Sequence, residues 1–103
     1  MEVLKKGSVE PLLVATRDRL SNISTLAGVS NLRFQVRDKL DDSVTQPDTT
    51  ATLDPDFPMT AICEIETTLA GYIHNHEYKL YLKFDDGSAA PILGPHFFRV
   101  EDD

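Results

Sequence analysis

Two closely spaced histidines are the residues in this chain whose chemistry is easiest to name. His74 and His76 are two positions apart, which puts both imidazoles on one side of an extended segment, and His96 could supply a third ligand. Zinc sites need three or four converging ligands and groups that orient them. The spacing supports only the first pair. A polar loop before Tyr78 is the simpler interpretation, and we expect no bound metal.

Aspartates in predicted turns and strand ends suggest calcium as a second kind of metal. They are Asp38, Asp41, Asp42, Asp54, Asp56, Asp85 and Asp86. Oxygen ligands from loops suit this cation, and Asp54 and Asp56 join the two histidines as candidate ligands. However, the chain has no Asp-x-Asp-x-Asp-Gly loop, and aspartate is favoured in turns for its own backbone hydrogen bonds. We predict a solvated acidic rim and no cofactor.

The single cysteine and the serines do not form a recognisable catalytic pattern. Cys63 alternates with Ala61 and Ile65 on the apolar side of a predicted strand, where cysteine behaves as a small hydrophobe. A reactive thiolate needs an exposed, electropositive setting, whereas Glu64 and Glu66 lie beside it. No Gly-x-Ser-x-Gly turn is present. We therefore predict that the protein is not an enzyme.

Residues 78–84 form the clearest predicted strand and carry the candidate interaction residues. Apolar and polar side chains alternate strictly, so that Lys79, Tyr81 and Lys83 share the outward face. An exposed tyrosine between lysines is typical of a protein interface, although an ordinary solvated sheet face fits equally well. Tyr78 begins the strand just after a glycine-containing corner, which predicts a tyrosine corner bonded back to the backbone.

Other segments show the same alternation. Strands are predicted at residues 31–38, 60–67 and 96–100, with a weak strand near 50–53 and an edge or irregular strand at 89–93. An Asp-Gly turn at residues 85–88 should join the last two strands to residues 78–84. Residues 11–17 are ambiguous, because apolar residues also fall on helical spacing over residues 9–21. We favour a strand there, since the sheet needs a partner. The alternative is an α+β fold with an N-terminal helix.

These elements predict a single all-β domain over residues 1–103. Short strands separated by turn signals indicate an immunoglobulin-like β-sandwich of two antiparallel sheets. Residues 1–7 and 101–103 are expected to be flexible. The inner faces should hold Leu13, Ala15, Leu32, Phe34, Val36, Ala61, Cys63, Ile65, Tyr78, Leu80, Leu82, Phe84, Phe98 and Val100.

The order of several motifs resembles the immunoglobulin-like domains of tailed-phage virion proteins, notably N-terminal domains of upper-baseplate proteins. The motifs are Lys-Gly-Ser-x-x-Pro-Leu-Leu at residues 6–13, Leu-Ala-Gly-Val at 26–29, Leu-Arg-Phe-Gln-Val-Arg-Asp at 32–38, and Gly-Pro-His-Phe-Phe-Arg-Val at 94–100. The gap between Gly71 and Tyr78 is longer than in that family, and the two-proline loop at residues 54–58 is extra. The resemblance implies a structural role in assembly, without catalytic residues.

Composition narrows the expected partners. With 17 acidic and 10 basic side chains, the net charge of -7 disfavours nucleic acid. No apolar run reaches the ~18 residues of a membrane span, and the first residues lack the apolar core of a signal peptide. We therefore expect protein partners that bind exposed strand edges or loops, with homo-oligomerisation through a strand edge as one form, in a virion or in the cytoplasm before assembly. The alternative is a calcium- or carbohydrate-binding sandwich.

Overall fold

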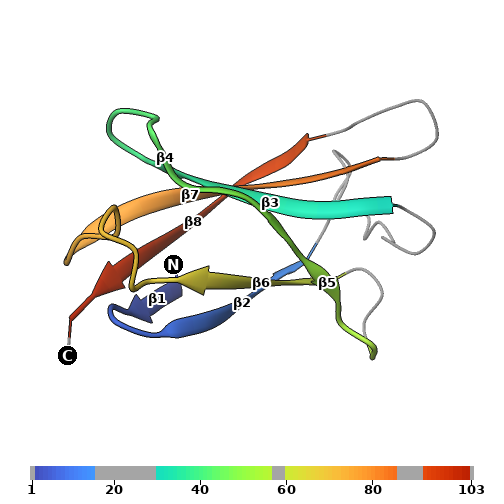
Figure 1. The fold of residues 1–103 in the computed structure, drawn as a ribbon, viewed down its shortest axis with the longest axis horizontal. Coiled ribbons are helices and arrows are strands. Elements are labelled where there is room, and N and C mark those ends of the chain that lie inside the picture. The colour runs from blue at the N-terminus through green and yellow to red at the C-terminus, as the bar shows by residue number, and fades with distance from the viewer. Residues whose placement is uncertain (1, 16–29, 57–59, 86–91, 103) are drawn as a thin grey trace.

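Two β-sheets packed face to face make up the fold (Figure 1). The computed structural model describes residues 2–15, 30–56, 60–85 and 92–102. The strands are β1 (Glu2–Lys5), β2 (Val9–Ala15), β3 (Ser30–Asp38), β4 (Val44–Thr50), β5 (Thr52–Leu53), β6 (Thr60–Glu66), β7 (His76–Asp85) and β8 (Ile92–Glu101). One sheet has the order β1-β8-β7-β3-β4 and the other has the order β2-β6-β5. The prediction of an all-β sandwich is confirmed.

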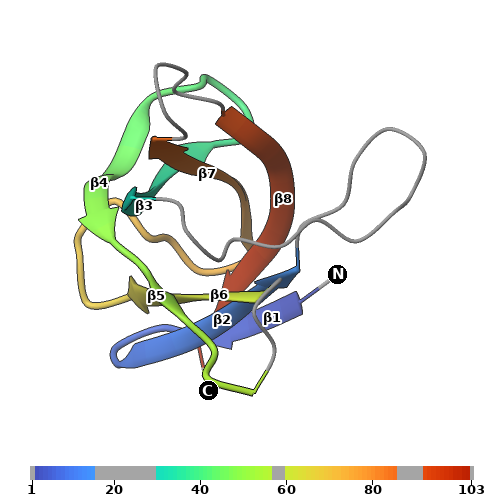
Figure 2. The same ribbon diagram turned by 90° about the vertical axis from the view of Figure 1, so that its right-hand side faces the viewer.

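The N-terminal segment differs from the predicted flexible tail. Residues 2–5 form β1, which runs parallel to β8 with Leu4 opposite Val100. Figure 2 shows β8 curving from one layer toward the other, so that its end lies beside β1. Leu4 is buried in the core, and burial of this side chain holds the strand in place. Because of this pair, the five-stranded sheet is not wholly antiparallel, contrary to the prediction.

Strand β2 confirms one prediction about the N-terminal third and corrects another. Residues 9–15 are a strand and not the start of a helix, while residues 16–21 lie outside the described residues. The register is shifted by one position from the predicted one. Leu12 and Val14 face the core, and Leu13 is 56% exposed. Ala15 also points outward. A one-residue shift moves every side chain of a strand to the other face.

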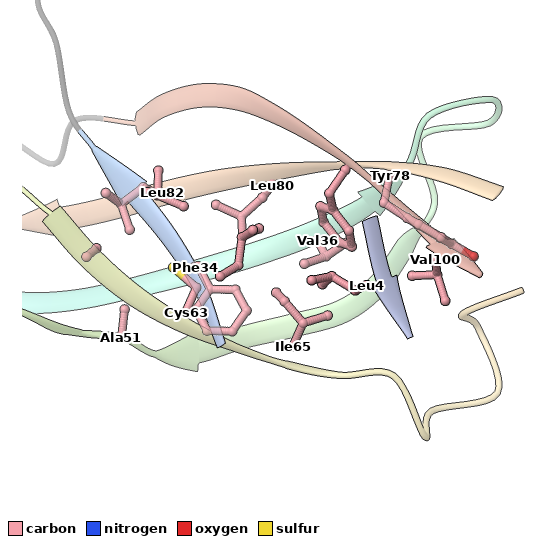
Figure 3. Packing of buried hydrophobic residues seen from close by; sticks show 14 of the residues in the cluster. Leu4, Phe34, Val36, Ala51, Cys63, Ile65, Tyr78, Leu80, Leu82 and Val100 are labelled. Carbon is pink, nitrogen blue, oxygen red and sulfur yellow. The ribbon is translucent and has the colours of Figure 1, made fainter. Parts of the chain in front are cut away.

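The core lies between the two sheets (Figure 3). Eleven of the predicted inner residues are buried, namely Phe34, Val36, Ala61, Cys63, Ile65, Tyr78, Leu80, Leu82, Phe84, Phe98 and Val100. Leu32 is partly buried against them. Five residues outside the predicted set complete the cluster, namely Leu4, Leu12, Val14, Ala51 and Tyr72.

The middle and the end of the chain hold more strand than predicted. Residues 44–50 form β4, paired with β3, and the weak strand predicted near 50–53 is the short β5 of the other sheet. Residues 92–101 form one strand in place of two, and β8 lies between β1 and β7 instead of at an edge. Glu101, from the predicted flexible end, completes β8. The predicted turn at residues 86–88 lies outside the described residues.

Tyr78 forms the predicted tyrosine corner. Its hydroxyl donates a hydrogen bond to the carbonyl oxygen of Gly71, 2.9 Å away, and accepts one from the backbone N–H of Ile73 at 2.7 Å. The ring is fully buried and packs edge-on against Tyr72, with 5.0 Å between ring centroids. The corner therefore fixes the connection between β6 and β7 to the start of β7.

A buried glutamine joins the two sheets. The side-chain oxygen of Gln46, on β4, accepts hydrogen bonds from the Tyr72 hydroxyl at 2.7 Å and from the N–H of Glu66 at 3.1 Å. Its amide nitrogen donates to the carbonyl of Glu64 at 3.2 Å. Since Gln46 is only 2% exposed, these bonds replace the water that its polar atoms would otherwise contact.

Candidate functional site

The outer face of the five-stranded sheet gathers basic side chains around one tyrosine. The antiparallel register of β3 and β7 places three pairs opposite one another: Arg33 with Lys83, Gln35 with Tyr81, and Arg37 with Lys79. These six outward side chains are called the Tyr81 face below. Alternation along both strands turns the adjacent Phe34, Val36, Leu80 and Leu82 into the core. The predicted interaction residues Lys79, Tyr81 and Lys83 thus lie together on it.

Both ends of the Tyr81 face place two cations directly opposite each other. Such like-charge pairs destabilise a sheet unless an anion separates them. Asp42, in the β3–β4 turn, does so at one end, because its carboxylate lies 2.7 Å from the Lys79 ammonium and 3.1 Å from the Arg37 guanidinium.

Asp48, on β4, does the same at the other end of the face. Its carboxylate lies 2.9 Å from the Lys83 ammonium and 3.5 Å from the Arg33 guanidinium. The Arg33 guanidinium also lies 3.6 Å from the Asp85 carboxylate. Two Arg–Lys–Asp groups therefore flank Tyr81. The Arg37–Lys79 pair shares the single carboxylate of Asp42, whereas the Arg33–Lys83 pair has Asp48 as a bridge and Asp85 beside Arg33.

The ion pairs change the titration of their members in the expected directions. The hydrogen bond from Lys79 lowers the pKa of the Asp42 carboxyl, and nearby Arg37 lowers it further. The same bond raises the pKa of Lys79. At the end of the sheet, a hydrogen bond from Lys39 lowers the pKa of Glu77. These groups are charged at neutral pH, so the pattern of charge on this face is fixed there.

A β-bulge presents Tyr81 at the middle of the face. Opposite Tyr81, β8 has two residues, Gly94 and Pro95, because the register shifts between Leu80 and Leu82. Gly94 has φ of 118°, and a Cβ atom there would lie 2.8 Å from the carbonyl oxygen of Leu80. A side chain at this position is therefore excluded both by backbone conformation and by space.

Tyr81 borders a shallow hollow that mixes aromatic, apolar and cationic groups. The Arg37 guanidinium carbon lies 5.6 Å from the centre of the Tyr81 ring, within cation–π range. The volume of this hollow is about 260 Å³. Gln35, Lys83 and the 60% exposed Ile92 complete its lining. Such a surface suits a side chain of a partner protein.

The larger hollow, of about 380 Å³, lies at the end of the sheet and is lined by Lys39, Leu40, Asn75, His76, Glu77 and Arg99. The Lys39 ammonium lies 5.4 Å from the centre of the Phe97 ring and 2.8 Å from the Glu77 carboxylate. The hollow therefore adds charged groups to the surface at this end of the sheet.

The candidate metal ligands are dispersed. His74 accepts a hydrogen bond at Nδ1 from the backbone N–H of Asp102, whereas Nε2 of His76 lies 3.7 Å from the carboxylate of Asp38. On β8, His96 lies opposite Leu80, whereas Val100 lies opposite His76. His96 is therefore four residues from the position opposite His76, or about 13 Å at the rise of a strand. The described residues contain no group of three or more His, Cys, Asp or Glu side chains placed to hold a metal ion.

The two aspartates proposed as ligands form a turn. The Asp54 carboxylate accepts a hydrogen bond from the backbone N–H of Asp56 at 2.9 Å, which is the local bond that favours aspartate in turns. This turn follows β5 in the three-stranded sheet, while His74 and His76 precede or begin β7 in the other. The structure thus does not bring the four residues together.

Cys63 is fully buried between the sheets, as the alternation predicted. Burial raises the pKa of its thiol to about 12, so the thiol stays protonated at neutral pH. The thiolate is the reactive form of cysteine, and a side chain without solvent contact cannot meet a substrate. Cys63 therefore acts as a core side chain.

Three of the six side chains of the Tyr81 face, Lys79, Tyr81 and Lys83, were predicted from the sequence. Arg33 and Arg37 alternate with buried residues on 31–38, so their outward direction was predictable. Their position beside Lys83 and Lys79 depends on the register between β3 and β7, which alternation does not specify. Asp42 and Asp48 were visible only as turn or loop residues, and nothing in the sequence marked them as bridges.

No protein-family model, curated protein or solved structure matches the chain. Among the described residues, no helix is long and apolar enough to cross a membrane.

Proposed function

We propose that the chain is a non-catalytic, immunoglobulin-like assembly module that binds an acidic protein surface through the Tyr81 face. The observation that carries the proposal is the arrangement of two Arg–Lys–Asp groups on either side of Tyr81. A protein with net charge -7 that gathers an excess of cations on one sheet face presents an anion-binding surface there.

The strand order supports the immunoglobulin-like part of this proposal. The neighbours β2-β6-β5 correspond to strands B, E and D of that fold, and β8-β7-β3-β4 correspond to G, F, C and C′. The tyrosine corner before β7 corresponds to the one before strand F. The resemblance to tailed-phage virion domains then suggests assembly of a phage or prophage-derived particle as the setting.

Binding through a sheet face is favoured over binding through a strand edge. Edge strand β2 carries Pro11, which has no N–H to donate. The carbonyl oxygen of Ser8 accepts a hydrogen bond from the N–H of Thr67, so the hydrogen-bonded pairs of β2 and β6 fall on even-numbered residues of β2. The backbone of Pro11 therefore faces the open edge. Edge strand β4 carries Pro47, and β1 and β5 are short. These are features that protect edges from pairing.

The Tyr81 face is also held in its geometry before a partner arrives. Lys79 and Lys83 are tied to carboxylates and lie on regular, paired strands. Less side-chain freedom is then lost on binding, which improves affinity without new contacts. A partner carboxylate would complete the charge balance at the Arg37–Lys79 end, where Asp42 alone bridges two cations.

The alternative of a calcium- or carbohydrate-binding sandwich has weaker support. Asp54 and Asp56 serve their own turn, and the hollow beside Tyr81 is shallow and bordered by cations rather than by carboxylates. Calcium prefers several converging oxygen ligands.

The proposal is tested by affinity capture from the native source with three baits. The first is the unmodified chain, the second carries Lys79→Ala and Lys83→Ala, and the third carries Lys5→Ala and Lys6→Ala. The third bait removes the same charge away from the Tyr81 face. We expect a specific partner, an acidic structural protein, that the second bait loses and the third retains. Tyr81→Ala should also lose it.

The same capture at increasing salt concentration tests whether binding of the partner is electrostatic in origin. Retention of the partner should fall as ionic strength rises, since salt screens exposed charges. If every captured protein binds the second bait as well as the first, the Tyr81 face is not the binding surface and the proposal is wrong.

A further inference from the structure

The outer face of the three-stranded sheet carries an apolar stripe that the folded domain leaves uncovered. Alternate residues of β2 point outward, and all of them are apolar: Val9, Pro11, Leu13 and Ala15. Val9 is 55% exposed and Leu13 is 56% exposed. In the register of β2 and β6, Leu13 lies opposite the half-buried Ile62, which widens the stripe.

This pattern is unusual for a strand with one solvated face. Such a strand alternates apolar and polar side chains, whereas a continuous apolar run is typical of a strand covered on both faces. The inward residues Leu12 and Val14 are covered by the core, and no described element covers the outward ones. The stripe is therefore suited to cover by another protein surface.

The border of the stripe indicates the charge of that surface. Glu66 lies opposite Val9, and Glu64 lies opposite Pro11, both with exposed side chains on the same face. The three strands β2, β6 and β5 contain no lysine or arginine. An occupant with apolar groups and cations would therefore satisfy both parts of the surface.

The chain itself carries a surface of this kind on its opposite side. The Tyr81 face has four cations against the three carboxylates of Asp42, Asp48 and Asp85. Phe97 and Ile92 lie beside it, opposite Lys79 and Lys83, and are 40% and 60% exposed. We propose that the apolar stripe of one copy docks on the Tyr81 face of a second copy, with Glu64 and Glu66 reaching the lysines. This inference rests on the proposed function, because it names a partner for the same face.

The geometry of the contact determines the assembly that it can form. Two different surfaces meet, so the first copy keeps a free Tyr81 face and the second keeps a free apolar stripe. The contact therefore builds open chains or rings rather than closed two-fold dimers. The three-stranded face measures roughly 14 by 23 Å from strand spacing and rise. The corresponding area, roughly 320 Å², is well below the ~800 Å² per partner of a stable interface. A single contact is therefore weak, and assembly requires high concentration or a particle that holds many copies.

The proposal is tested by sedimentation velocity on the full chain at concentrations up to about 1 mM, where a contact with a dissociation constant of about 1 mM is populated. We expect the average sedimentation coefficient to rise continuously with concentration, and Leu13→Glu should weaken self-association by at least about tenfold. The matched control is Ile73→Glu, which adds the same charge at a site that is 49% exposed in the β6–β7 connection. The control should associate as the unmodified chain does.

A charge exchange gives the decisive comparison. The double variant Glu64→Lys, Glu66→Lys should be monomeric alone, and so should Lys79→Glu, Lys83→Glu. An equimolar mixture should associate again, since each altered face then meets a complementary one. A monomeric unmodified chain at every concentration, or a mixture that stays monomeric, would overturn the proposal. Either result leaves the capture experiment on the Tyr81 face unaffected, so the two failures are distinguishable.

Discussion

The Tyr78 hydroxyl and the Gly71 carbonyl oxygen are 2.9 Å apart, and this bond spans the connection between the two sheets. It holds the β6–β7 connection against the strand that presents Tyr81 on its other face. The corner thus links the core to the surface that we propose binds a partner. Removing the bond should lower the stability of the fold, and it should affect the Tyr81 face only as a consequence of that loss.

Tyr78→Phe should lower the free energy of unfolding by about 1–3 kcal/mol, because the Gly71 carbonyl and the Ile73 N–H both lose their partner. Urea denaturation followed by tyrosine fluorescence or circular dichroism measures the change. Tyr81→Phe is the control, since that hydroxyl lies on the outer face, and it should change stability by less than about 0.5 kcal/mol. Equal effects of the two substitutions would argue against a structural corner.

Gln46→Leu should destabilise the fold by about 2 kcal/mol or more. The substitution leaves the Tyr72 hydroxyl and the Glu66 N–H without their shared acceptor in a buried setting. Gln35→Leu makes the same change on the outer face and should cost much less. Both values come from denaturation curves. Similar costs at the two positions would mean that the buried bonds contribute little.

The register of β2 predicts opposite outcomes for two adjacent leucines. Leu12→Ala creates a core cavity and should cost about 2–5 kcal/mol. Leu13→Ala removes an exposed side chain and should change the free energy of unfolding by less than about 0.5 kcal/mol. Thermal or urea unfolding of the two variants measures the difference. A larger loss from Leu13→Ala than from Leu12→Ala would show that Leu13, and not Leu12, faces the core.

Cys63 should be inert toward thiol reagents in the folded protein. Its thiol is fully buried, and its pKa is raised to about 12, so labelling at pH 8 requires unfolding. Labelling with an aromatic disulfide should be complete in denaturing urea and slow in buffer, at a rate that follows stability across the variants above. Rapid labelling of the folded chain would contradict the core position.

His96 should make stability fall on mild acidification. Burial lowers the pKa of its imidazole below the value in the unfolded chain, and Nε2 has no hydrogen-bond partner among the described residues. The unfolded state therefore binds the proton more readily. Stability is full above the unfolded value near 6.5 and falls as the pH drops through it.

The measurement is the melting temperature of the unmodified chain and of His96→Gln between pH 8 and pH 5. The variant should have the shallower dependence, since glutamine does not titrate. His74→Gln is the control for loss of an exposed imidazole. If His96→Gln and the unmodified chain have the same slope, His96 does not carry the effect.

The sequence was most informative where one face of a strand is buried and the other solvated. Residues 31–38, 60–67 and 78–84 alternate with Ile62 as the exception, and their predicted inner residues are buried except for the partly buried Leu32. Residues 9–15 were harder, because both faces of β2 are apolar and alternation cannot select one. The uncovered apolar stripe and the error in register therefore have the same origin.

The sequence by itself determined the fold class, the buried faces of the central strands and the outward direction of Lys79, Tyr81 and Lys83. These follow from local periodicity, which the backbone imposes on each strand separately. Only the tertiary structure decided that β1 pairs parallel with β8, that Gln46 bridges the sheets, and that Arg33 and Arg37 stand opposite the lysines. Pairing and register between distant segments depend on the packing of the whole core, and no local pattern encodes them.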